Sequence, residues 1–296
     1  GNDERTQSPG AGVGCVEGER TDRASGVPTS SPALTHPRGR QPEGERVTLQ
    51  VGEQDGPAQE GQGAFAAATG RSLEGDNAKP RYLEYQRELI RPYAGRSVLE
   101  IGAGDGEFVS GYHDAERYVV TDVDPDAVSQ MKKRFADRSD VEVQQFDGDG
   151  SGRLDEPVET LLAINVLEHI EDDAGALRSL SKSVTPGGKV IMFVPGYQQL
   201  YGEFDRLVGN YRRYTPRTLA AAAQRAGLST EVSKPVNFLG AFAWWAAVRK
   251  GGTGSPNPKL VALYDQYVVP VTKAIEKNVR VPFGQSILLV ARTPVA

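Results

Sequence analysis

Val-Leu-Glu-Ile-Gly-Ala-Gly-Asp-Gly-Glu-Phe, residues 98–108, is the segment that best indicates how this chain folds. It begins as a buried strand and ends in glycines at Gly102, Gly104 and Gly106. Because glycine has no Cβ, a strand that ends in such a turn lets a ligand approach its backbone closely. Glu100 adds a carboxylate at the lip of the turn. The turn is therefore better suited to a ligand that carries a positive charge than to a pyrophosphate.

Strand and helix patterns alternate along the chain on both sides of this turn. We expect strands over 97–101, 118–123, 141–146, 160–165, 189–194, 228–232 and 285–291, and helices over 79–92, 107–112, 125–135, 172–184 and 217–226. Thr185–Gly188 reads as a turn before the fifth strand, and Thr215 with Pro216 reads as a helix start. Such alternation predicts a parallel sheet with helices on both faces, and a ligand at the carboxyl ends of its central strands.

The first 75 residues have a different composition, rich in Gly, Pro, Ser, Glu, Arg and Gln with no hydrophobic period. Such a segment buries too little apolar surface to offset its ordering entropy, so residues 1–75 are interpreted as a disordered tail. The alternative is a tail that docks a partner or caps the active site. Residues 76–296 are expected to form the folded domain.

Composition excludes several classes of function. The net charge of −5 indicates no nucleic-acid partner, and one cysteine, Cys15, leaves no disulfide framework or cysteine metal cluster. The three histidines are far apart in the sequence, so no metal is expected. No apolar run approaches the roughly 20 residues that span a bilayer. We therefore expect a cytoplasmic protein, a monomer or a homo-oligomer, with a small-molecule substrate.

Polar residues end the next three expected strands, where a ligand would lie. Asp122 follows the first glycine by about 20 residues, the position at which an acid binds two ribose hydroxyls. Asp147 can accept a hydrogen bond from an adenine amino group, and Asn165 can bind a small polar group. Asp124 is a rival to Asp122, but it precedes Pro125 and is better explained as a helix cap.

The glycine turn alone also fits a nicotinamide-dependent oxidoreductase. The dinucleotide pattern Gly-x-Gly-x-x-Gly would place a small residue at position 107, where this chain has Glu107. The turn also follows a helix and does not open the folded part of the chain. The oxidoreductase stays open as an alternative, as does a non-catalytic binding protein with the same fold.

Five segments in this order, 98–108, 119–125, 146–147, 164–170 and 185–194, resemble class I S-adenosylmethionine-dependent methyltransferases. The similarity covers roughly residues 80–295, and the Leu-Glu-His of residues 167–169 resembles the branch that acts on small molecules. The resemblance implies a Rossmann-like, doubly wound sheet of seven strands with an antiparallel last strand. It also implies S-adenosyl-L-methionine as the cofactor, bound by Glu100, Gly102, Gly104, Gly106, Asp122, Val123, Asp147, Gly148 and Asn165.

His169 follows the fourth strand, near the expected position of the methyl group. It could take a proton from the acceptor, or it could be a helix-start histidine bonded to backbone. Residues 197–214 resemble a lid that usually reads Gly-His-Tyr-Arg-Arg-Tyr, but this chain has Gly209-Asn210, which puts a base at position 210 in doubt. Candidates for acceptor contact are Tyr197, Tyr201, Tyr211, Arg212, Tyr214, Phe238, Trp244 and Trp245. The alternative for the lid residues is a structural role, in which they pack against the fold and form an ion pair with Asp205 or Glu203.

Residues 237–282 form an insertion between the sixth and last strands. Its first part is strongly apolar, its second part has helical spacing, and 251–258 form a flexible joint between them. We interpret it as a helical lid over a hydrophobic acceptor; a dimer or membrane-surface contact, or ordinary core, are the alternatives. The sequence thus predicts a methyltransferase for a small, hydrophobic or aromatic molecule such as a secondary metabolite.

Overall fold

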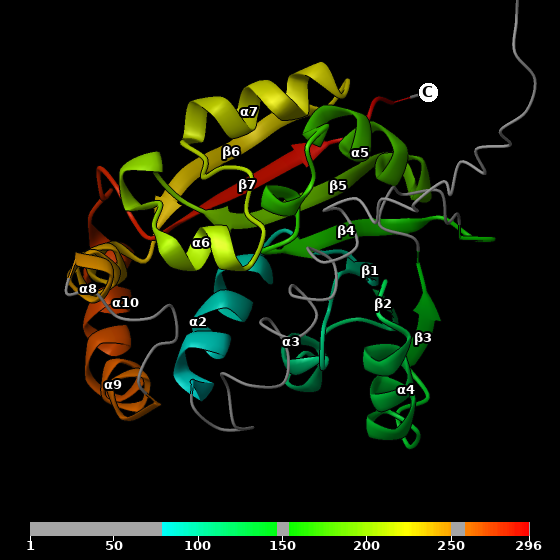
Figure 1. Ribbon diagram of the computed structural model, residues 1–296. Helices are drawn as coiled ribbons and strands as arrows, with labels where there is room; N and C mark the ends of the chain where they lie inside the picture. The colour runs from blue at the N-terminus through cyan, green and yellow to red at the C-terminus, as the bar shows by residue number, and fades with distance from the viewer. Residues whose placement is uncertain (1–78, 147–153, 250–257, 296) are drawn as a thin grey trace, which may run out of the picture. The chain divides into compact units, whose positions relative to one another are not determined.

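The computed structural model describes residues 79–146, 154–249 and 258–295, which all belong to one compact unit, residues 54–296. The predicted tail, residues 1–75, lies outside the described residues. The strands are β1 (Ser97–Ile101), β2 (Arg117–Asp122), β3 (Val141–Gln145), β4 (Val158–Ile164), β5 (Val184–Pro195), β6 (Ser229–Val236) and β7 (Ser286–Arg292). They form one sheet in the order β3-β2-β1-β4-β5-β7-β6 (Figure 1).

Strand direction confirms the predicted fold class. The pairs from β3 to β5 are parallel, whereas β7 runs antiparallel to both β5 and β6. The order along the chain reverses between β1 and β4, which makes this pair the switch point at which doubly wound sheets bind ligands. The glycine turn follows β1 directly, so it lies at that point.

Helices cover both faces of the sheet (Figure 1). One face carries α5 (Asp173–Leu180) and α7 (Pro216–Arg225), and the other carries α2 (Pro80–Ile90), α3 (Glu107–Ser110) and α4 (Pro125–Arg134). Each face has its own buried core because side chains alternate between the two sides of a strand. In β1, for example, Leu99 packs with α5 and α7, whereas Val98 packs with α2, α3 and α4.

Local sequence fixes where two of these helices begin. The Asp124 side chain accepts a hydrogen bond from the backbone N–H of Asp126 at 2.9 Å, and Pro125 occupies the first helical turn of α4. Thr215 caps α7 in the same way. The expected helix cap at Asp124 is therefore confirmed, and this leaves Asp122 as the acid available to a ligand.

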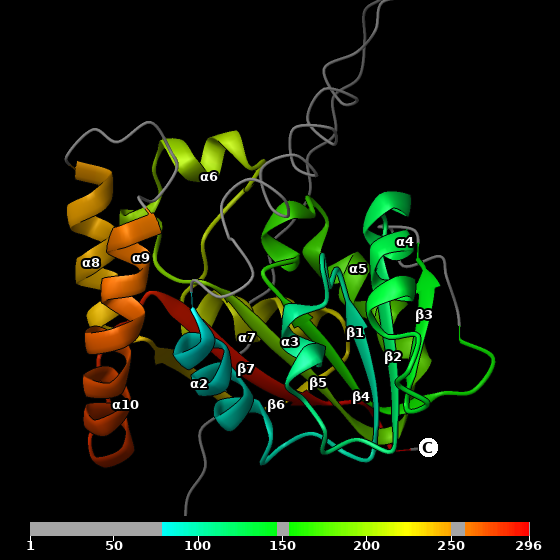
Figure 2. The same ribbon diagram turned by 90° about the horizontal axis from the view of Figure 1, so that it is seen from below.

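The insertion folds into helices beyond the β6–β7 side of the sheet, next to α2 (Figures 1 and 2). It contains α8 (Phe238–Arg249), α9 (Pro258–Leu263), a π-helix (Tyr264–Val268) and α10 (Val269–Asn278). Shorter elements follow β4 and β5: 3-10 helices at Leu167–His169, Ser181–Ser183 and Gln198–Leu200, and α6 at Glu203–Leu207. None of the described helices is both long enough and apolar enough to cross a bilayer.

Two expected boundaries differ in the structure. The turn expected at Thr185–Gly188 lies within β5, which begins at Val184. Val184 pairs with Val158 and Lys189 pairs with Thr160, so the intervening residues form a bulge in the ladder. The helix expected over 172–184 ends at Leu180, followed by a 3-10 turn.

Candidate cofactor and acceptor site

The glycine turn leaves open space above its middle residue. Gly102, Gly104 and Gly106 have φ angles of 67°, 56° and 74°, in the left-handed region that favours glycine. A Cβ on Gly102 or Gly106 would come within 2.6 Å of a side-chain carbon of Val166 or Phe135, whereas one on Gly104 would meet nothing within 4 Å. Packing therefore excludes side chains at the two outer glycines, and the space over Gly104 can receive a ligand.

Asp122 is held beside that space by two backbone groups. Its Oδ2 atom accepts a hydrogen bond from the N–H of Gly104 at 2.8 Å, and its Oδ1 atom accepts one from the N–H of Asp124 at 2.9 Å. A carboxylate has about four lone-pair positions, so the half-buried group keeps acceptor capacity for ligand hydroxyls. The geometry suits the ribose role predicted from the sequence.

Glu100 lies deeper than the sequence suggested. Its side chain is buried in β1 and does not reach the lip of the turn, and it accepts a hydrogen bond from the Tyr118 hydroxyl at 2.7 Å. Burial raises the pKa of Glu100 to about 7, against the opposing effects of Tyr118 and the Arg87 charge. The expected exposed negative charge at the turn is wrong, because the alternation of side chains along β1 directs this residue into the core with Val98. Its contact with a cofactor stays a prediction.

Residues with unusual backbone angles follow three strands that run in the same direction and end at the same edge of the sheet. Asn165, Tyr197 and Asn237 have φ angles of 53°, 62° and 60°, and they come directly or shortly after β4, β5 and β6. Left-handed φ is rare for a tyrosine, and such strain tends to cluster at functional sites. The sequence pointed to Asn165 and Tyr197; Asn237 was missed because its neighbour Phe238 carried the apolar signal.

The remaining predicted cofactor residues are less well defined. Val123 follows Asp122 and its side chain is exposed, as a residue that packs on a ligand would be before binding. Asp147 and Gly148 lie outside the described residues, so the predicted adenine contact stays a prediction.

His169 ends the 3-10 turn that follows β4. Burial lowers the pKa of its imidazole to about 4, against a hydrogen bond with the backbone of Gly209, so the ring is neutral at pH 7. A neutral imidazole can accept a proton, and the backbone contact is also the feature expected of a structural histidine. Its neighbour Glu168 was not predicted: its side chain is buried, and burial raises the pKa of its carboxyl group to about 8.

A buried ion pair organises the segment after β5. Arg213 donates to both carboxylate oxygens of Asp205, at 2.8 and 2.9 Å, and both side chains are buried. Asp205 also accepts hydrogen bonds from the Asn210 side chain at 2.8 Å and from the Gly202 N–H at 2.9 Å. Asn210, which replaces the histidine of the resembled lid, thus helps to hold the acid of this pair. The alternative of an ion pair between Arg212 and Asp205 or Glu203 is wrong, because Asp205 pairs with Arg213, Glu203 pairs with Arg206 and Arg212 pairs with Asp173.

The other lid candidates have different exposures. Tyr211 is exposed, whereas Arg212 forms an ion pair with Asp173 at 3.1 Å. Tyr214 is buried in the core, and its hydroxyl donates to Asp173 at 3.1 Å. Tyr201 donates to the carbonyl of Asn210 at 2.7 Å. Contact with the acceptor stays a prediction for all four residues. The exposed Tyr211 is the best placed to reach an acceptor, and the buried Tyr214 is the worst placed.

The two tryptophans of α8 face different surroundings. Trp244 donates its indole N–H to the Leu200 carbonyl at 3.0 Å and packs between Phe204 and the Arg213 guanidinium. Trp245 is 48% exposed and lines an open, almost wholly apolar cavity of about 330 Å³. We call this cavity the apolar groove; its walls are Tyr197, Gln199, Leu200, Ala241, Phe242, Trp245 and Phe283.

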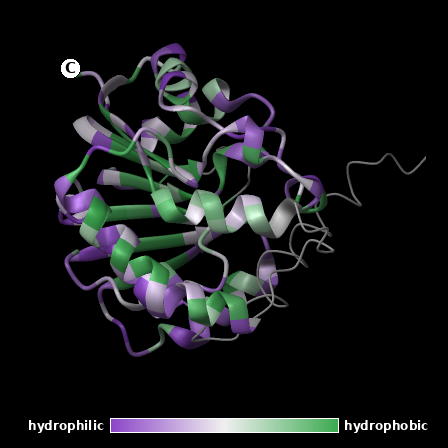
Figure 3. Cartoon of the chain, turned by 90° about the vertical axis from the view of Figure 1, so that its left-hand side faces the viewer, coloured by the Kyte–Doolittle hydropathy of each residue, from purple (hydrophilic) through white to green (hydrophobic). Residues whose placement is uncertain are grey.

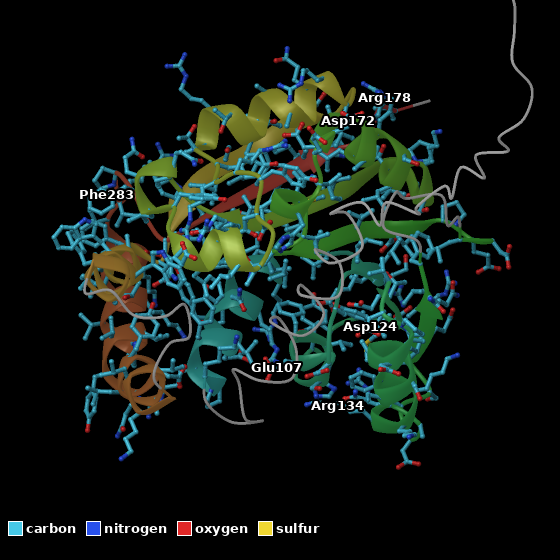
Figure 4. The ribbon with its side chains drawn as sticks, in the orientation of Figure 1. Glu107, Asp124, Arg134, Asp172, Arg178 and Phe283 are labelled. Atoms are coloured by element: carbon cyan, nitrogen blue, oxygen red, sulfur yellow. The ribbon has the colours of Figure 1, made fainter. Side chains whose placement is uncertain are left out.

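Phe283 supports the groove from the loop before β7. Its ring contacts Phe238 and Phe242 with centroid distances of 4.9 and 5.3 Å, so Phe238 stands behind the groove wall. Figure 4 shows Phe283 on the α8 side of the molecule, whereas Glu107 on α3 and Asp124 at α4 lie on the other side of α2. The groove and the glycine turn are thus separate parts of one sheet edge.

Comparison with known proteins agrees with this geometry. A family profile described as a methyltransferase domain matches residues 99–190. The ubiquinone biosynthesis O-methyltransferase of Alkalilimnicola ehrlichii is 32% identical over 117 residues, which are 38% of this chain and 47% of that protein. The match therefore spans about half the length of this relative.

Solved structures share the fold at low sequence identity. A chain from the complex of the Haloferax volcanii Trm112 methyltransferase activator with a methyltransferase has a TM-score of 0.52 and 18% identity, over 73% of this chain and 90% of that one. An S-adenosylmethionine-dependent methyltransferase from Mesorhizobium loti has a TM-score of 0.50 and 13% identity, over 72% and 97%. The [4+2]-cyclase SpnF has a TM-score of 0.50 and 17% identity, over 81% and 93%.

The cyclase illustrates that this fold alone does not determine a reaction. The assignment of this chain as a methyltransferase rests on the profile match, together with the open glycine turn and the acid at the end of β2. Residues 99–190 match a methyltransferase domain, and the order of the sheet and the glycine turn agree with the resemblance to class I S-adenosylmethionine-dependent methyltransferases.

Proposed function

We propose that the protein transfers a methyl group from S-adenosylmethionine to a small hydrophobic molecule. The observation that carries this proposal is the arrangement of two spaces along one sheet edge. The open space over Gly104 follows β1, and the apolar groove begins at Tyr197 after β5, which lies two strands further along the sheet. Neighbouring strands are about 4.8 Å apart, so the two strand ends are separated by roughly 10 Å.

The chain's own residues would do little covalent chemistry. S-adenosylmethionine, when bound, supplies an electrophilic methyl group on a sulfonium. Because its sulfur would leave with the electron pair of the broken carbon–sulfur bond, this chain's residues would need to bind and align the acceptor's lone pair without activating the donor. Asp122 would hold the ribose, and the groove walls would orient the acceptor and exclude water. An acceptor that carries a proton would also have to release it.

His169 is the candidate base for that proton. Its neutral imidazole is in the correct protonation state at pH 7, although the depressed pKa makes it a weak base. Its catalytic role stays a prediction, and the turnover of a His169→Asn variant tests it. A variant that keeps full turnover would make His169 a structural residue.

Isothermal titration of the full chain tests the cofactor assignment. We expect saturable binding of S-adenosylmethionine and of its demethylated product, and no comparable binding of NADH, because Glu107 departs from the dinucleotide glycine pattern. Absence of binding to both sulfur compounds would overturn the proposal, and binding of NADH would favour the oxidoreductase. Binding without turnover on any apolar acceptor would favour a non-catalytic protein.

The two tryptophans provide a matched pair of variants for the acceptor site. Trp245→Ala removes an exposed wall of the apolar groove, so we expect the acceptor KM to rise about tenfold with unchanged cofactor affinity and stability. Trp244→Ala removes a packed indole, so we expect a loss of roughly 3 kcal/mol of unfolding free energy. Equal effects of both changes on KM would contradict this division.

A further inference from the structure

The helical segment from Pro258 to Asn278 carries apolar side chains on its outward side, although its inward side also packs Val269 into the core. Its inward side carries Asp265, Thr272 and Glu276, of which the first two are 4% and 1% exposed. Its outward side carries Leu260, Leu263, Tyr267 and Val271, each more than half exposed (52–63%). A surface helix ordinarily turns its apolar stripe toward the core, so this arrangement needs an explanation on each side.

The inward acids are used to fasten α2. Asp265 accepts hydrogen bonds from the N–H groups of Arg81 and Tyr82, at 3.2 and 2.8 Å. It thereby caps the N-terminus of α2, whose own N-cap residue, Lys79, makes no side-chain cap bond. Glu276 accepts from the Tyr85 hydroxyl and from the Phe238 N–H. These contacts explain the inward side and leave the outward stripe unexplained.

The outward side also carries a charge of one sign. Between residues 258 and 280 there are two acids, Asp265 and Glu276, and both are engaged inward. The same stretch contains four exposed basic residues, Lys259, Lys273, Lys277 and Arg280, of which Lys273 forms an ion pair with Glu88 of α2. The whole chain has a net charge of −5, so this basic face differs from the composition of the molecule.

The neighbouring helix α8 extends the apolar character of this side of the protein. Phe242 and Trp245 are about half exposed, at 50% and 48%, and both line the apolar groove. Contacts between α8 and α10 bring the two helices together. Figure 3 turns this side toward the viewer and shows hydrophobic stretches on the outer helices. An apolar surface of this kind, bordered by polar groups, is typical of an interaction site.

We propose that this face docks on the surface of an anionic lipid bilayer. The face consists of Leu260, Leu263, Tyr267 and Val271 with the basic residues Lys259, Lys277 and Arg280 around them. Apolar side chains would enter the boundary between headgroups and acyl chains, and the basic residues would contact anionic headgroups. A combination of apolar area and basic charge is the two-part signal that gives reversible membrane binding.

Charge favours a bilayer over a second copy of the chain as the occupant. Two such faces brought together would place lysines and arginine opposite lysines and arginine, which is repulsive. A bilayer surface with anionic lipid has the opposite charge. Docking would also place the mouth of the apolar groove near a source of apolar acceptors, since Phe242 and Trp245 belong to the same group of helices.

Vesicle sedimentation with the full chain tests the proposal. We expect the protein to sediment with vesicles of phosphatidylcholine containing about a quarter phosphatidylglycerol, and far less with pure phosphatidylcholine or at high salt. Leu263→Glu should lower vesicle affinity at least about tenfold, because it removes apolar area and adds a repelled charge. Val295→Glu changes another exposed apolar residue, 80% exposed after β7, and should bind as the unaltered chain does.

Three outcomes would overturn docking on a bilayer. The first is no sedimentation with either vesicle, and the second is equal loss of binding in Leu263→Glu and Val295→Glu. The third is a concentration-dependent dimer in analytical ultracentrifugation that Leu263→Glu abolishes while vesicle binding is absent; the face would then be a contact between copies. The test needs no cofactor and no acceptor, so its result is independent of the proposed methyl transfer.

Discussion

Asp122→Ala is expected to lower the affinity for S-adenosylmethionine roughly a hundredfold, about 2.7 kcal/mol. The reason is the position of the carboxylate: the Gly104 and Asp124 N–H groups fix it beside the open glycine turn, with acceptor capacity toward that space. Hydrogen bonds to a charged acceptor contribute more than neutral ones, and a ribose offers two donors. Isothermal titration with the cofactor and with its demethylated product measures the change.

Asp124→Ala is the matched control for this loss. The two acids are separated by a single residue, but the Asp124 side chain caps α4. Its removal should cost about 1 kcal/mol of stability and leave the cofactor affinity within about threefold. Asp122→Ala also removes the acceptor of the Gly104 N–H, so the thermal unfolding of this variant must be measured together with its cofactor affinity. An Asp122→Ala variant that folds normally and binds with unchanged affinity would remove the ribose assignment.

Asp205→Ala is expected to reduce the unfolding free energy by about 3–5 kcal/mol, the cost of removing one partner from a buried ion pair. The Arg213 guanidinium would stay buried without its carboxylate, since the Asp205 and Arg213 side chains are 0% and 3% exposed. The change would also leave the Asn210 side chain and the Gly202 N–H without this acceptor. Urea unfolding followed by circular dichroism measures the loss.

The exposed pair of Glu203 and Arg206 in the same helix provides the control. Surface ion pairs contribute little, so Glu203→Ala should change stability by no more than about 0.5 kcal/mol. Replacing both buried partners by apolar residues, Asp205→Leu with Arg213→Met, should recover much of the loss because no charge then stays buried and unpaired. Equal losses of unfolding free energy in Glu203→Ala and Asp205→Ala would show that the buried ion pair contributes no more to stability than the exposed one.

The sequence predicted those features of the site that depend on strand ends. Asp122 and Asn165 were found because a parallel sheet brings the carboxyl ends of its strands to one edge, and the structure places both there. Helix starts at Pro125 and Pro216 were found because capping is a local property. The expected turn at 185–188 lies within β5 as a bulge between the paired residues Val184 and Lys189, and Gly187 has the left-handed φ angle of a turn.

Features that depend on contacts between distant segments could not be read from the sequence. Trp244 and Trp245 are adjacent and chemically identical, and only packing against Phe204 and Leu200 distinguishes the first from the second. The hydrogen bond to Glu100 comes from Tyr118, a residue of another strand, β2. The capping of α2 by Asp265 joins residues that no pattern in either segment connects.

The cap on α2 has a consequence for the order in which the chain folds. Tyr82 and Asp265 are 183 residues apart, so α2 leaves the ribosome long before its cap exists. At 5–20 residues per second, synthesis of that interval takes about 10–40 s. During this time α2 lacks its cap, and segments close to it in the sequence cannot replace that cap. A nascent chain stalled before residue 265 should therefore be cut readily within α2 by protease, whereas the released protein should resist.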